Sequence, residues 1–80
     1  MDIRKQVGIN LQRLRRDKGW SQEDLAFESG LHRTYVSGIE RGVRNPTVLI
    51  LERLARTFGV APAELLAERR KAAGRRKPRR

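Results

Sequence analysis

Residues 21–46 read SQEDLAFESGLHRTYVSGIERGVRNP, and this stretch predicts two short helices joined by a glycine turn. Ser21 is typical of a residue that caps the start of a helix, and Asp24, three residues later, completes a capping box. Gly30 favours the left-handed conformation that ends one helix before the next begins, and Gly42 does the same for the second helix. Two capped helices around such a turn are the layout of a helix-turn-helix, whose second helix protrudes and fits the major groove of duplex DNA.

Three more helices are predicted on either side of this stretch. A helix from about residue 2 to residue 18 is indicated by apolar residues at helical spacing, with Gly19 as its stop: Ile3, Val7, Leu11 and Leu14. Thr47 is predicted to cap a helix that ends at Gly59 and carries the inward stripe Val48, Leu51, Leu54, Ala55 and Phe58. Pro62 opens a last helix, expected to fade near Lys71. The expected fold class is therefore all-α, a bundle of five helices.

The charge of the chain is divided unevenly along its length. The 80 residues include 19 Lys and Arg, of which eight lie in residues 69–80, whereas all nine Asp and Glu lie in residues 1–68. A segment so basic and so poor in apolar residues cannot bury enough surface to fold. We therefore expect one DNA-binding domain, residues 1–68, and a disordered basic tail, residues 69–80, that either follows DNA phosphates or is merely solubilising.

Composition argues against several other functional classes. The chain has no Cys and a single histidine, His32. The ordinary interpretation of His32 is that it caps the second helix of the helix-turn-helix. We therefore expect neither a metal nor a cofactor. No set of catalytic side chains can be assembled, which argues against an enzyme. No apolar run is long enough to cross a membrane and no signal segment opens the chain, so a soluble, cytoplasmic protein without a membrane partner is expected.

Several linked motifs carry a resemblance to a known family. They are Ser21-Gln22-Glu23-Asp24-Leu25-Ala26, Ile39-Glu40-Arg41-Gly42, Asn45-Pro46-Thr47, and Leu54-Ala55 with Gly59-Val60. In order and spacing, Leu11 to Leu66 resembles the lambda-repressor-like helix-turn-helix family, the phage repressor, Cro and Xre-type proteins. Members of this size include restriction-modification controller proteins, phage repressors and antitoxins. The resemblance implies a lambda-repressor-like five-helix bundle that regulates transcription, for example as a repressor.

The second helix of the motif should carry the contacts to DNA. Arg33 is the candidate for reading guanine through two hydrogen bonds, although it could instead bind only phosphate. Thr34 suits a thymine methyl group or a phosphate, and Ser37 and Gly38 are expected on the same outward face. Gly38 is open to two interpretations, a close approach of backbone to DNA or simple tolerance of glycine.

Further candidates surround that helix. Four are predicted phosphate contacts, of which the two arginines could equally be solvated surface charges: Tyr35, Arg41, Arg44 and Asn45. The resemblance implies that Gln22 grips phosphate and braces the second helix, and that Glu40 pairs with Arg15. The acids Glu23, Asp24 and Glu28 form either a solvated face or, as in some members of the family, a surface that recruits RNA polymerase.

Apolar residues left over by the predicted core suggest a homodimer through the last two helices: Leu49, Ile50, Val43 and Leu66. They could instead complete a small core. A two-fold dimer would place two reading helices one DNA turn apart and match a palindromic operator on double-stranded DNA. Two alternatives stay open, an antitoxin or protein-interaction module with secondary DNA binding, and an RNA-binding protein driven by the basic tail.

Overall fold

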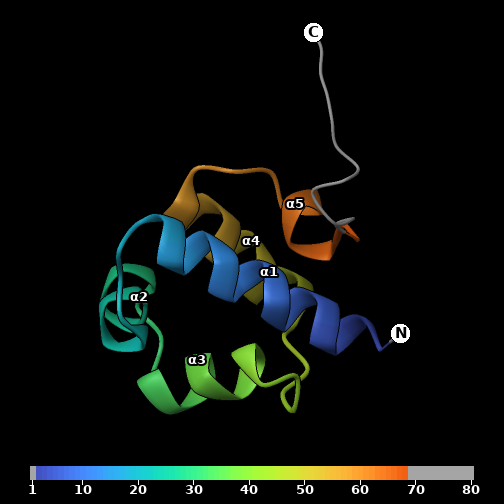
Figure 1. The fold of residues 1–80 in the computed structure, drawn as a ribbon, viewed down its shortest axis with the longest axis horizontal. Coiled ribbons are helices and arrows are strands. Elements are labelled where there is room, and N and C mark those ends of the chain that lie inside the picture. The colour runs from blue at the N-terminus through green and yellow to red at the C-terminus, as the bar shows by residue number, and fades with distance from the viewer. Residues whose placement is uncertain (1, 69–80) are drawn as a thin grey trace, which may run out of the picture.

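The computed structural model describes residues 2–68 and shows five helices and no strand among them. The helices are α1 (Ile3–Asp17), α2 (Gln22–Ser29), α3 (Arg33–Glu40), α4 (Val48–Phe58) and α5 (Ala63–Leu66). In Figure 1, α1 crosses the middle of the molecule with α4 behind it, α3 lies along the lower edge, and α2 lies at one end. The predicted all-α, five-helix bundle is confirmed. The predicted tail, residues 69–80, lies outside the described residues.

The core is apolar and draws on every helix. The apolar side chains that are completely shielded from solvent are Leu11, Leu25, Val36, Ile39, Leu54 and Leu65. The prediction that Ile3 and Val48 face the core is wrong, because both side chains are exposed. Both lie in the first turn of a helix. There the apolar stripe that faces the core further along the helix is not covered by other helices. Each contributes apolar surface to the outside of the protein instead.

The predicted capping box and glycine stop of the first helix of the motif are confirmed. Ser21 Oγ accepts a hydrogen bond from the Asp24 amide at 3.0 Å, and the Asp24 carboxylate accepts one from the Ser21 amide at 2.9 Å. Gly30 ends α2 with a φ of 75°, in the left-handed region that glycine adopts without strain. His32 occupies the capping position before α3, but the prediction that its side chain caps the helix is wrong, because its ring makes no capping hydrogen bond. The start of α3 therefore depends on packing rather than on a side-chain cap.

Two residues of α1, Gly8 and Asn10, position two of the other helices. Gly8 lies against the carbonyl oxygens of Ile39 and Glu40, and a Cβ atom there would be 2.6 and 2.5 Å from them. Asn10 is fully buried, and its amide nitrogen donates to the carbonyls of Leu65 and Ala67, each at 2.8 Å. Glycine thus lets the end of α3 approach α1, while asparagine fastens α5 to it.

The last helix is shorter than predicted. α5 ends at Leu66, and Ala67 is already extended, whereas the sequence suggested a helix that fades near Lys71. Asn10 occupies the carbonyls of this segment, which favours an early end to the helix. Across residues 2–68, none of the helices combines the length and the apolar character needed to cross a membrane.

Candidate nucleic-acid interface

The outward face of α3 presents four of the predicted contact residues together. Arg33, Thr34 and Arg41 are exposed, and Ser37 is half-buried between them. At helical spacing these four side chains lie on one side of α3, and Arg41 Nε reaches Ser37 Oγ at 3.4 Å. On the opposite side the buried residues Val36 and Ile39 anchor the helix to the core. The result is a short polar and basic edge, supported from behind and open to a ligand.

A buried ion pair holds the end of α3. Glu40 accepts from Arg15 Nε at 2.6 Å and from Arg15 Nη2 at 3.0 Å, and the carboxylate side chain is only 1% exposed. The hydrogen bond with Glu40 raises the pKa of Arg15, which outweighs the opposite effect of burial. Arg15 also donates to the Trp20 carbonyl at 2.8 Å, so it links α1, the turn before α2, and α3. The predicted pairing of Arg15 with Glu40 is confirmed.

Gln22 joins the same group. Its amide nitrogen donates to Glu40 Oε1 at 3.0 Å. This bond connects the first residue of α2 to the last residue of α3, which confirms the predicted bracing role. Contact between Gln22 and phosphate stays a prediction.

Gly38 does not lie on the outward face, so that prediction is wrong. It is buried, and the atoms that cover it belong to Arg44: an added Cβ would overlap Arg44 Cγ and lie 3.4 Å from Cδ and Nε. The Arg44 guanidinium lies over the Tyr35 ring, with its carbon 5.6 Å from the ring centroid. Asn45, the next residue, is exposed. The turn after α3 therefore places Arg44 on the flank of that helix.

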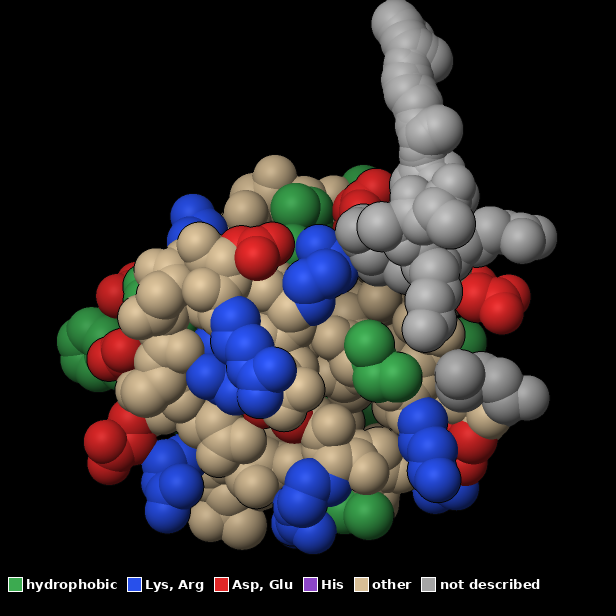
Figure 2. All heavy atoms as spheres, viewed as in Figure 1, with side chains coloured by type: hydrophobic (Ala, Val, Ile, Leu, Met, Phe, Trp, Pro, Cys, Tyr) green, Lys and Arg blue, Asp and Glu red, His purple; other side chains and the backbone are tan. Residues whose placement is uncertain are grey.

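Charge is segregated between the two helices of the motif. Figure 2 shows blue Lys and Arg side chains along the lower edge, where Figure 1 places α3, and red carboxylates at the end formed by α2. The exposed acids of α2 are Glu23, Asp24 and Glu28. Phe27, in the middle of them, is 84% exposed. A polyanion is thus attracted to α3 and repelled by the outer face of α2.

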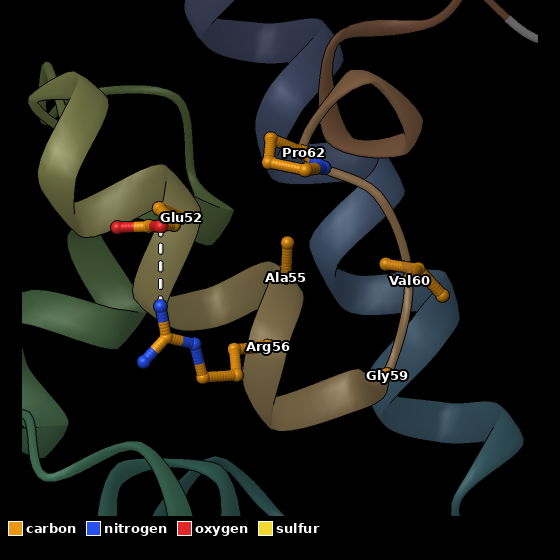
Figure 3. Close-up of a pocket in the computed structure, with 6 residues that line it drawn as sticks. All are labelled: Glu52, Ala55, Arg56, Gly59, Val60 and Pro62. Carbon is orange, nitrogen blue, oxygen red and sulfur yellow. Dashed lines mark hydrogen bonds and ion pairs between the residues drawn. The ribbon is translucent and has the colours of Figure 1, made fainter.

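A second exposed surface lies on α4. Val48 and Leu49 are 80% and 75% exposed, and Leu66 of α5 is partly exposed. Beside them is a hollow of about 350 Å³, open to solvent, in which Glu52 and Arg56 form an ion pair at 3.1 Å (Figure 3). Ile50, predicted with this group, is half-buried and packs against the core, so it adds little to the exposed surface.

Comparison with known proteins decides the family. Residues 11–65 match the family model described as helix-turn-helix. The chain belongs to the helix-turn-helix family. This helix-turn-helix protein is 52% identical over 66 residues to the HTH-type transcriptional regulator y4dJ of Sinorhizobium fredii, a match that covers 82% of this chain and 86% of that protein.

Two further relatives are named as control or controller proteins. Control protein C.BamHI of Bacillus amyloliquefaciens is 46% identical over 66 residues, which cover 81% of this helix-turn-helix protein and 82% of the relative. Among solved structures, the restriction-modification controller protein C.Esp1396I, a tetramer in complex with its natural 35 base-pair operator, superimposes with a TM-score of 0.73. The two are 38% identical, and the match covers 81% of this chain and 86% of that one. The predicted membership of this family is confirmed, and restriction-modification controller proteins are among the relatives.

Proposed function

We propose that this chain is a transcriptional regulator that binds a palindromic operator as a homodimer and reads its sequence with α3. The observation that carries the proposal is the edge formed by Arg33, Thr34, Ser37 and Arg41 on a helix held from behind by Val36, Ile39 and the Arg15–Glu40 pair. A protruding helix with a basic, hydrogen-bonding edge fits the major groove. The relatives named as transcriptional regulators and the operator complex of C.Esp1396I support the same function.

Selection of bound duplexes from a random DNA pool at physiological salt tests the proposal. We expect a palindromic consensus whose half-sites are about 10 base pairs apart, one turn of DNA. No enrichment, or a consensus without two-fold symmetry, contradicts the proposed mode of binding.

Arg33 is proposed as the base-reading residue because it is exposed in the first turn of α3. Arg33→Ala should weaken binding to the consensus duplex by about 1–3 kcal/mol more than binding to random duplex. Arg41→Ala is the matched comparison on the same edge, and as a phosphate contact it should weaken both duplexes alike and lower the salt dependence. Equal losses for both duplexes with Arg33→Ala would assign that residue to phosphate.

The homodimer is proposed to form through α4 and α5. Val48, Glu52 and Arg56 share one side of α4 at helical spacing, with Leu49 next to Val48, so this surface has an apolar part at the start of the helix followed by an ion pair. A second copy that packs on this side would cover Leu49 and Leu66, and would place Glu52 of each chain within reach of Arg56 of the other. The hollow beside Ala55 and Val60 offers space for an apolar side chain.

Sedimentation tests the dimer. Leu49→Lys should be monomeric at tens of micromolar and should bind the full operator more weakly, because it loses the second half-site. Phe27→Lys is the matched control, since Phe27 is at least as exposed but lies on α2. A wild-type chain that sediments as a monomer with and without operator, or a Phe27→Lys chain that dissociates as readily as Leu49→Lys, refutes the proposed interface.

The outer face of α2 supports a second role, contact with RNA polymerase. A phenylalanine that is 84% exposed among three carboxylates suits a basic protein surface with an apolar socket, and these charges keep it away from DNA. In transcription reconstituted from purified components, Phe27→Ala should lower activation while operator binding stays the same. Unchanged activation at full operator occupancy contradicts this role.

A further inference from the structure

Gly38 lies inside α3, where glycine destabilises a helix by about 1 kcal/mol relative to alanine. Its φ is not in the left-handed region, so backbone conformation does not require glycine. What requires it is space: the side chain of Arg44 lies across the Cα of Gly38, and a Cβ there would overlap Arg44 Cγ. The glycine therefore forms a notch in the side of the helix that the stem of Arg44 fills.

Two other contacts fix Arg44 in this place. The Gly38 carbonyl accepts hydrogen bonds from the amides of Val43 at 3.0 Å and of Arg44 at 3.2 Å, so the turn winds back onto α3. The Arg44 guanidinium lies over the Tyr35 ring, one helical turn before the notch. Gly38 thus holds both the backbone and the stem of Arg44, and Tyr35 lies beneath its guanidinium.

The guanidinium stays available to a ligand in this arrangement. The contact with the Tyr35 ring uses none of the oxygen acceptors that the five guanidinium N–H groups can bind. Arg44 is exposed, and within residues 2–68 it is not among the arginines whose side chains donate hydrogen bonds or form ion pairs, which are Arg4, Arg13, Arg15, Arg41 and Arg56. A bidentate acceptor such as a phosphate is the group that this geometry fits.

We propose that Gly38 is a positioning residue, whose missing side chain holds Arg44 on the flank of α3 as a preformed contact to DNA phosphate. The proposal rests on the proposed DNA-binding function. An arginine that is ordered before binding loses less side-chain freedom when the complex forms, which increases affinity. Gly38 itself contributes no contact to DNA, because Arg44 covers it.

Binding measurements on the consensus duplex test the proposal through Gly38→Ala, Arg44→Ala and the double variant. Gly38→Ala should raise the helix propensity of α3 and still weaken binding about 3- to 10-fold, since Arg44 is displaced. Arg44→Ala should weaken binding to all duplexes and reduce the salt slope by about one. In the Arg44→Ala background, Gly38→Ala should have no further effect, because nothing remains for the notch to hold.

A readout in the free protein separates positioning from a general loss of structure. The position of the Arg44 side chain over the Tyr35 ring should move the NMR resonances of its Cδ protons upfield, and Gly38→Ala should return them to ordinary values while thermal unfolding stays cooperative. Ordinary Arg44 shifts in the wild type overturn the proposal, and this measurement needs no variant to fold.

Each remaining outcome is decisive as well. Unchanged binding by Gly38→Ala, or an equal loss with and without the Arg44 side chain, overturns the positioning role. A wild-type chain that binds no duplex would instead refute the proposed function, so the two failures are distinguishable.

Discussion

Removing the Glu40 carboxylate is the most informative single perturbation of this fold. Glu40→Ala deletes two hydrogen bonds with Arg15 and one with Gln22, and leaves the Arg15 guanidinium with only its bond to the Trp20 carbonyl. The backbone contact between α1 and the end of α3 is unaffected, because it uses the Glu40 carbonyl oxygen. The substitution therefore isolates the ion pair from the helix packing around it.

The expected loss of stability is large for a domain of this size. Removing one member of a buried ion pair costs about 3–5 kcal/mol because the other charge is left without its partner. Arg15 is 11% exposed, so water relieves part of this penalty and about 3 kcal/mol is expected. The whole unfolding free energy of some 70 residues is about 3–10 kcal/mol, so much of it should disappear.

Urea unfolding followed by the fluorescence of Trp20, the single tryptophan, measures the effect. With a slope of about 1 kcal/mol per molar urea, the midpoint should fall by about 3 M. The matched control is Arg4→Ala, which breaks an ion pair of similar length, Arg4 to Asp2 at 2.8 Å, whose side chains are 45% and 37% exposed. Because exposed pairs contribute little, its midpoint should move far less. Equal shifts for the two variants would refute the reasoning that burial of the pair gives it its importance.

Three other substitutions test the remaining structural contacts. Asn10→Ala should lower the unfolding free energy by about 1–3 kcal/mol in the same urea assay, because two carbonyls of the last helical segment lose their donor. Gly8→Ala should be destabilising by about 1–3 kcal/mol in spite of the better helix propensity of alanine, and a more stable variant would contradict the close packing against Glu40. The hydrogen bond from the Arg4 side chain lowers the pKa of Asp2 to about 2, so its stabilising effect is present above pH 4 and is lost as the pH falls toward 2. The thermal midpoints of wild type and Asp2→Asn should accordingly converge over that range.

Much of the fold was predictable because the signals that start and end its helices are local. The capping box of Ser21 and Asp24, and the left-handed glycines that follow the first four helices, depend on neighbouring residues only. Apolar spacing then located the core of α3 and most of α4. The pairing of Arg15 with Glu40 is different, since it joins residues 25 apart, and it came from the family resemblance rather than from spacing.

The errors arise where a residue serves a distant part of the chain. Gly8 and Asn10 carry no apolar signal, and their roles depend on α3 and α5, which no local pattern reveals. Gly38 was misplaced although its partner, Arg44, is only six residues away, because the turn after α3 folds the Arg44 side chain back onto the helix. Val48 was misplaced for the opposite reason, since a correct helical stripe continued beyond the part of α4 that other helices cover.

The restraints on α3 are distributed unevenly, and this has a consequence for recognition. Its last residue is held by Arg15 and Gln22, and its C-terminal half lies against Gly8 and beneath Arg44. Its first turn has no side-chain cap and meets the core only through apolar packing. The residues proposed to read bases therefore lie in the first turn of α3, where few polar contacts to the rest of the fold are made. We therefore expect substitution of Arg33 to have little effect on stability, whereas substitution of Glu40 should destabilise the fold.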